Sequence, residues 1–239
     1  MNINSIHDKQ LNGLAADLAE LHKSIQLFKA IEKNWGGINL LSDEDKKWVL
    51  FLKTTAFYQS VIFLSRLYDS NLNKKKKRCI LGFRNNSEAS SKTRCIRSFL
   101  KEILEHNLNK PVYVEMLWGE FYMRYTRVMD LIKMESNEAP EHFLEKALVY
   151  VNLEYGNKKK NTLLYKLKTI RNKSVAHNED FIIQSKIFIE DVELLADLAD
   201  SILEYTGRFL SLGQHSLYEK IDGIIHHQID KIFSSHEQL

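Results

Sequence analysis

The chain has 239 residues, of which 44% are hydrophobic and 27% are charged. This length is sufficient for one large domain or two small ones, and a net charge of +3 does not by itself indicate a nucleic-acid-binding protein. The nine glycines and two prolines are too few for the turns of a β-rich protein, so the composition favours an all-α fold.

Apolar residues recur at helical spacing along most of the chain. Gly36-Gly37 is predicted to end the first helix, Ser42 to cap the second, and Pro111 to open the fourth. A short strand over residues 180–190 would have no evident partner. The predicted helices cover residues 5–33, 42–69, 90–106, 111–135, 141–154, 163–176, 189–212 and 215–233. The simplest arrangement is a single helical domain over residues 1–239.

The location of the protein and its metal content are predicted mainly from what the sequence lacks. Cys79 and Cys95 form no CxxC motif, so we expect free thiols in a reducing cytoplasm. The N-terminus does not resemble a secretory signal, and no apolar stretch approaches the ~20 residues that span a bilayer. His226, His227 and Asp230 are better explained by helix packing than by a metal site. We therefore expect a cytoplasmic protein with no metal, cofactor or membrane segment.

Basic residues are concentrated in two segments. Residues 74–101 hold ten basic side chains and one acidic side chain, and residues 157–173 hold seven basic side chains and no acid. Such clusters bind phosphate backbones, although for 74–78 alone a solvated lysine-rich loop is the favoured explanation. The residues predicted to contact RNA are Lys75, Lys76, Arg78, Lys158, Lys159, Lys160, Lys168 and Lys173.

The second basic segment leads into RNKSVAH, from Arg171 to His177. An arginine followed after four to six residues by a histidine is expected about once by chance in a chain of this composition. It occurs twice, with five intervening residues between Arg171 and His177 and six between Arg208 and His215. Context separates the two pairs: Arg171 precedes the polar Asn172, whereas Arg208 precedes an apolar run. A helix end, where basic side chains favour the helix dipole, remains an alternative explanation for Arg171.

The string LKTIRNKSVAHNE resembles the signature of HEPN-domain proteins, and more narrowly that of HEPN-like proteins of the abortive-infection type. In that group an earlier helix commonly carries an apolar run ending in Arg-x-x-Asp, and SVIFLSRLYDSN, with Arg66 and Asp69, is similar. The resemblance covers about residues 40–212. It leaves an N-terminal helix over 5–33 and a C-terminal helix over 215–233 as additions.

The resemblance implies a bundle of four to five core helices that forms a homodimer, with two Arg–His motifs facing each other across the two-fold axis. Many members are metal-independent endoribonucleases that act as toxins or in phage defence. By position, Arg171, Asn172 and His177 match the motif. The family also implies a protein partner, such as a nucleotidyltransferase antitoxin.

The chemistry of these side chains suits metal-free RNA cleavage. An imidazole can exchange protons near neutral pH, and a guanidinium can hold two phosphate oxygens without losing its charge. Asn172 can position a phosphate or the imidazole. On a regular helix Arg171 and His177 would lie about 120° apart, so they meet only if the helix ends first or if the arginine reaches across. Because the mechanism uses the 2′-OH, it predicts specificity for RNA.

Two further interpretations stay open. Arg66 and Asp69 share one helix face, where they either line the cleft and hold Arg171 or His177 in place or form an intrahelical ion pair of little energy. The aromatic residues over 113–125 have core spacing, although Tyr122 or Tyr125 could stack on a base if exposed.

The leading hypothesis is therefore a metal-independent endoribonuclease of the toxin or phage-defence type. The alternatives are a catalytically silent HEPN-like helical module that binds RNA or a partner protein, and a small-molecule enzyme built in a helical bundle.

Overall fold

The computed structural model describes residues 3–68, 95–105, 111, 115–156, 162–171 and 187–210. Within these ranges every regular element is a helix and no strand occurs, which confirms the all-α prediction. The helices are α1 (Ile3–Lys33), α2 (Trp35–Ile38), α3 (Asp43–Tyr68), α4 (Ile96–Glu105), α5 (Glu115–Arg124), α6 (Thr126–Ile132), α7 (His142–Gly156), α8 (Leu163–Ile170) and α9 (Ile189–Arg208).

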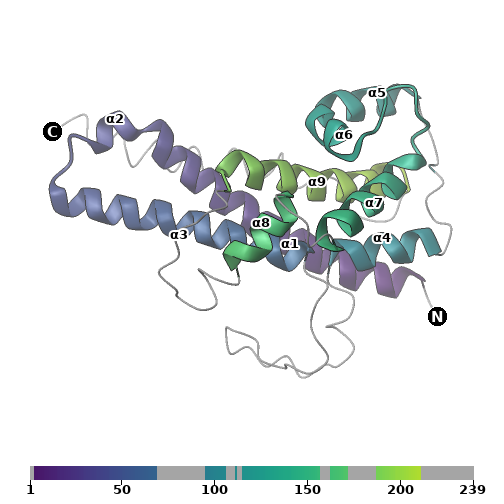
Figure 1. The fold of residues 1–239 in the computed structure, drawn as a ribbon, viewed down its shortest axis with the longest axis horizontal. Coiled ribbons are helices and arrows are strands. Elements are labelled where there is room, and N and C mark those ends of the chain that lie inside the picture. The colour runs from purple at the N-terminus through teal and green to yellow at the C-terminus, as the bar shows by residue number, and fades with distance from the viewer. Residues whose placement is uncertain are drawn as a thin grey trace, which may run out of the picture.

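Helices α1 and α3 form a long antiparallel hairpin, with the single turn of α2 at its far end (Figure 1). The backbone N–H of Asp45 donates to Ser42 Oγ at 3.2 Å, which confirms Ser42 as the cap of α3. The first helix ends at Lys33, in agreement with the predicted range 5–33. Gly36 and Gly37 lie within α2 instead of terminating α1.

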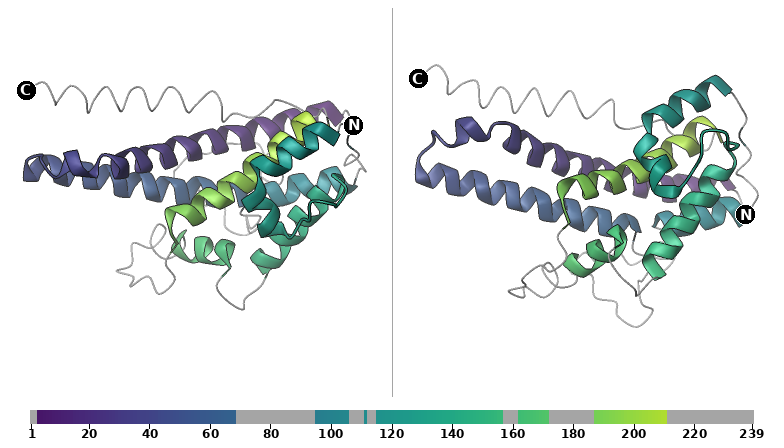
Figure 2. Two further views of the ribbon diagram at one scale, coloured as in Figure 1. Left: turned by 90° about the horizontal axis from the view of Figure 1, so that it is seen from above. Right: turned by 45° about the horizontal axis from the view of Figure 1, so that its top comes forward.

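The remaining helices surround one half of this hairpin. Helix α9 packs against both α1 and α3, and α8 lies between α7 and α3. Helix α4 packs on α7, while α6 contacts α7 and α9. The views in Figure 2 show the hairpin extending well beyond the helices that cover its other half.

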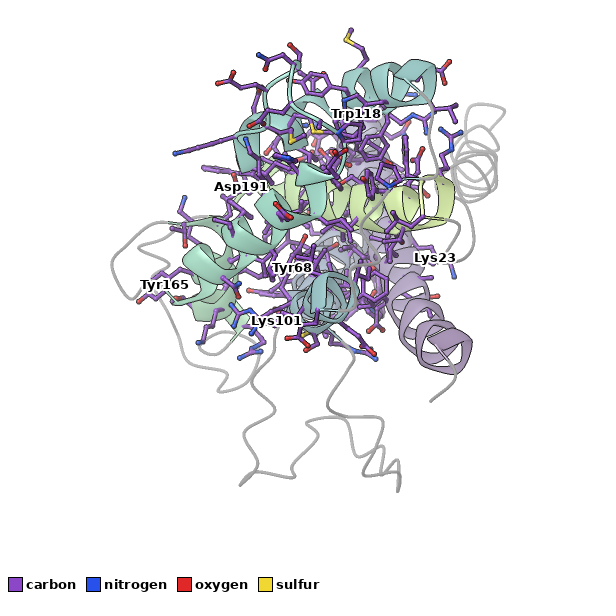
Figure 3. The ribbon with its side chains drawn as sticks, turned by 90° about the vertical axis from the view of Figure 1, so that its right-hand side faces the viewer. Lys23, Tyr68, Lys101, Trp118, Tyr165 and Asp191 are labelled. Carbon is purple, nitrogen blue, oxygen red and sulfur yellow. The ribbon has the colours of Figure 1, made fainter. Side chains whose placement is uncertain are left out.

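The buried side chains form one connected hydrophobic cluster from Leu14 on α1 to Leu210 after α9. Tyr68 ends α3 inside this core, and its hydroxyl donates to the Leu195 carbonyl oxygen at 2.7 Å. Figure 3 shows Tyr68 in the interior and Tyr165 projecting outward from α8. This hydrogen bond ties the end of α3 to α9.

The prediction of one continuous helix over 111–135 is wrong. Pro111 is not helical, α5 begins at Glu115, and the chain breaks at Tyr125 before α6 starts. The backbone at Tyr125 leaves the helical region with φ −107° and ψ 31°. Lys133, in the left-handed conformation at φ 57°, then ends α6. Two short helices therefore replace one long helix.

The aromatic residues of α5 do belong to the core, as predicted. Trp118 stacks on Phe121 with ring centroids 5.5 Å apart, and Phe121 meets Phe143 edge to face at 5.3 Å. Tyr125 is buried and Tyr122 is partly buried, with its hydroxyl on the Met134 carbonyl at 3.1 Å. The burial of Tyr125 removes it from the candidates for base stacking.

Several expectations fall on particular segments. Cys95 is a buried free thiol, while Cys79 lies outside the described residues, as do the predicted helix over 215–233 and most of the 180–190 segment. Phe188 is extended, and α9 begins directly after it. In the described part of the chain, α3 alone is long and apolar enough to cross a membrane. This is weak evidence for a span, because core helices share the same properties.

Candidate functional site

Arg171 caps the C-terminal end of α8, where the RNKSVAH motif begins. Thr162 starts this helix from an extended conformation, and its side chain accepts a hydrogen bond from the Tyr165 backbone N–H at 3.3 Å. At the other end, the Arg171 N–H donates to the carbonyls of Leu167 and Lys168. Thus α8 is a short helix whose capped start and packed apolar side fix the position of Arg171.

The side of α8 that carries Arg171 is the side that faces the core. Leu164 and Leu167 precede it by seven and four residues, so all three fall on one helical stripe, and both leucines are buried. Arg171 itself is partly buried, and burial lowers the pKa of its guanidinium below the ordinary value. A basic residue that only decorated a helix end would project into water. Arg171 instead extends the apolar stripe.

Lys168 is the one predicted RNA-binding lysine within the described ranges, and it is partly exposed on α8. The exposed face of the same helix presents Tyr165, Lys166 and Thr169, with the Thr169 hydroxyl donating to the Tyr165 carbonyl at 2.9 Å. The structure therefore describes one end of the candidate site. Asn172, His177, Asp69, Lys75, Lys76, Arg78, Lys158, Lys159, Lys160 and Lys173 lie outside the described residues.

Arg66 has a partner that neither sequence interpretation included. Its Nη2 lies 3.0 Å from Asp17 Oδ1 on α1, and its guanidinium lies 5.6 Å from the ring centroid of Phe63. The Arg66 side chain is about half exposed, whereas that of Asp17 is largely buried. The ion pair therefore fastens α3 to α1. Asp17 could have been noticed only as the acidic member of an otherwise apolar stripe.

A buried polar network at the centre of α9 was also missed. The Tyr125 hydroxyl lies 2.7 Å from both Asp200 Oδ2 and Glu204 Oε2. Arg124 donates from Nη1 to both oxygens of Glu204, at 2.9 and 3.1 Å, and Arg208 Nη1 lies 3.1 Å from Glu204 Oε1. Burial is the main cause of two pKa shifts in this network. It raises the pKa of the Tyr125 hydroxyl above its ordinary value, and it raises the pKa of the Asp200 carboxyl to about 6.

Phe121 packs against the Tyr125 ring, and the network ties α9 to the junction of α5 and α6, so it stabilises the fold. It also gives a role to Arg208, which belongs to the second Arg–His pair in the sequence: its cation faces the fully buried Glu204. The sequence signal is the spacing of Asp197, Asp200 and Glu204, which places three carboxylates on one side of α9.

No cluster of three histidine, cysteine or acidic side chains suited to a metal ion occurs among the residues whose placement is described. His226, His227 and Asp230 fall outside that part of the chain. The prediction that the protein needs no metal therefore stays a prediction.

Comparison of the chain with family models, with curated proteins and with solved structures finds no match.

Proposed function

We propose that the protein is a metal-independent endoribonuclease of the toxin or phage-defence type, acting in the cytoplasm as a HEPN-like homodimer. The observation that carries the proposal is the position of Arg171 on the core-facing stripe at the end of α8. Holding a guanidinium partly out of water opposes its charged form, and ionisable groups perturbed in this way gather at functional sites.

In the proposed reaction, His177 moves the proton of the 2′-OH or of the leaving oxygen, and Arg171 holds the phosphate as negative charge develops on it. Asn172 positions the phosphate or the imidazole. Because α8 ends at Ile170, the separation of about 120° that a continuous helix would impose need not apply within the motif. The lysines of 157–173 would guide the RNA backbone to this point.

A partner-binding module without catalysis is the alternative, and the surface of α3 favours it. Trp48 is 62% exposed, Phe51 59% and Leu52 44%, and the first two rings meet edge to face with centroids 5.9 Å apart. These positions are three and four residues apart, so they form one apolar face. An exposed apolar face of this kind is typical of protein-binding surfaces, such as one for a nucleotidyltransferase antitoxin.

The test is cleavage of total RNA in EDTA. We expect wild-type protein to cleave and His177→Ala to lose about 10²–10⁴-fold in rate, the usual contribution of a general acid or base. Arg171→Ala should lose a comparable factor. Arg171→Lys should recover only part of the rate, because an ammonium keeps the charge without the planar fork.

His215→Ala is the matched control, since it removes the histidine of the second Arg–His pair, which is spaced one residue wider. Equal losses in His215→Ala and His177→Ala would show that the motif has no special role. Wild-type cleavage that EDTA abolishes would contradict the metal-free mechanism. Binding of RNA without any cleavage would favour the module, as would expression that is equally well tolerated for wild type and for Arg171→Ala.

A further inference from the structure

A shallow groove lies at the far end of the hairpin, away from the helices that pack around α8. It is bounded by the last turns of α1, by α2 and by α3, and has a volume of about 840 Å³. Its lining combines charged side chains with one large aromatic residue, Trp35, which is 38% exposed. The lining residues are Lys29, Glu32, Lys33, Trp35 and Lys53.

The cations of the groove differ in what they already contact. Lys29 forms an ion pair with Glu193 on α9, and Lys53 Nζ lies 3.0 Å from Glu32 Oε1. Lys33 is exposed, and no ion pair with it is found among the described residues. Since Lys29 and Lys53 are each balanced by a carboxylate, Lys33 supplies the excess positive charge of the groove, which favours an anionic ligand.

The aromatic ring is held in place by its neighbours. The Lys53 ammonium lies 5.2 Å from the Trp35 ring centroid and 4.7 Å from that of Phe28. This double cation–π contact fixes the indole at the junction of three helices while leaving part of it open to solvent. A fixed, partly exposed indole near Lys33 can stack on a flat ring while the lysine contacts an attached anion.

The two glycines after Trp35 are also consistent with a binding site. A Cβ at Gly36 or Gly37 would meet no atom within 4 Å, and neither residue has the positive φ that would require glycine. Glycine is among the least favourable helix residues, so packing and backbone conformation do not explain this pair within α2. Its absence of side chains leaves the backbone beside Trp35 open to close approach by a ligand.

From these four features we propose that the groove binds single-stranded RNA, with a base stacked on Trp35 and an adjoining phosphate next to Lys33. Sites for single strands combine a positive groove with an exposed aromatic platform, whereas the bases of a duplex are stacked on one another. A small metabolite fits less well, because small-molecule sites enclose most of their ligand and this groove is wide open. The site is independent of cleavage and would persist in an inactive variant.

The first test uses Trp35 as its own reporter. The chain has three tryptophans, of which Trp118 is buried, so Trp48→Phe leaves Trp35 as the exposed indole. In a Trp48→Phe/His177→Ala protein, an oligouridylate of about ten nucleotides should quench the fluorescence saturably and less strongly as salt increases. If the oligonucleotide does not quench Trp35 at concentrations at which it saturates the protein at other sites, the proposal is overturned.

The second test measures affinity by anisotropy of the labelled oligonucleotide, in the His177→Ala background. Trp35→Ala and Lys33→Glu should each weaken binding at least about fivefold, the low end of the effect of losing one stacked base. Their matched controls, Trp48→Ala and Lys47→Glu, change exposed residues of α3 outside the groove and should bind as the parent does. Equal weakening by the controls would refute the assignment.

Other ligands decide the chemical class. The assignment to RNA would be overturned if tripolyphosphate, ATP or polyglutamate quenched Trp35 as strongly as the oligonucleotide, since the ligand would then be a small anion or an acidic protein. Equal affinity for a duplex RNA would overturn the assignment to a single strand. If the wild-type protein does not cleave RNA but the oligonucleotide still quenches Trp35 fluorescence, the proposed activity alone is contradicted. Cleavage without any quenching of Trp35 would contradict the groove alone.

Discussion

The contact of Tyr125 with two carboxylates has a consequence for stability. A phenol has one proton to donate, yet the Tyr125 oxygen lies 2.7 Å from both Asp200 Oδ2 and Glu204 Oε2. If Tyr125 donates to one carboxylate, the other can form a hydrogen bond only by carrying a proton and donating it to the phenol oxygen. At low pH one of the two acids should therefore be neutral in the folded state.

Asp200 is the acid that should hold this proton. Glu204 already forms ion pairs with two cations, Arg124 and Arg208. Asp200 is 4% exposed, and burial, helped by the negative charges of Glu204 and Asp197, raises its pKa to about 6 against an ordinary value of 3.8. The hydrogen bond from Tyr125 and the charge of Arg124 act in the opposite direction but do not cancel the effect of burial.

Because the folded-state pKa is raised, the folded protein binds more protons than the unfolded chain between pH 4 and 6. The contribution of Asp200 to stability is therefore fully present below its unfolded pKa and is lost as pH rises through about 6. A shift of that size corresponds to about 3 kcal/mol in full, of which about 1.4 kcal/mol falls between pH 5 and pH 8.

Asp200→Asn removes this titration while its amide can still donate to the Tyr125 oxygen. We expect the free energy of unfolding of the variant, relative to wild type, to rise by about 1.4 kcal/mol from pH 5 to pH 8, as measured by urea denaturation. In a Tyr125→Phe background Asp200 stays buried, so the effect of Asp200→Asn should keep its sign. A difference between Asp200→Asn and wild type that is the same at both pH values would refute the assignment of the proton.

Two further predictions concern contacts between helices. Tyr68→Phe removes the hydrogen bond to the Leu195 carbonyl and should lower the free energy of unfolding by about 1 kcal/mol with no change in helix content; an unchanged urea midpoint would contradict this role. Arg66→Ala and Asp17→Ala should show a coupling energy below about 1 kcal/mol in a double-mutant cycle, because the pair is partly solvated. A larger coupling would mean that the pair is better shielded from water than its exposed arginine indicates.

The helices could be predicted from the sequence because each has an apolar stripe at helical spacing, and capping signals such as Ser42 marked the start of α3. The break at Tyr125 could not, because the apolar spacing through Phe121, Tyr125 and Val128 continues across it without interruption. Tyr125 instead contacts two carboxylates that follow it by 75 and 79 residues. Tertiary contacts of this range leave no periodic signal in the sequence.

For the candidate site, Arg171 was identified from its neighbours in the sequence. That it lies on the core-facing side of its helix was not predicted. Counting back from Arg171 by four and seven residues reaches Leu167 and Leu164, so the stripe was visible in the sequence alone. How far the guanidinium is removed from water depends on how α8 packs between α7 and α3, which spacing does not determine. The groove at Trp35 was likewise unpredictable, since its lining comes from three helices.

The two Arg–His pairs show why spacing had to be supplemented by packing. Arg208 lies one helical turn after the fully buried Glu204, and neutralising that carboxylate is a sufficient reason for an arginine at its position. Arg171 lies on a segment, 157–173, that contains no acidic residue, and it continues a stripe of buried leucines. Replacing Arg208 should therefore impair folding, whereas replacing Arg171 should impair RNA cleavage. A variant pair that showed the reverse would move the functional assignment to the end of α9.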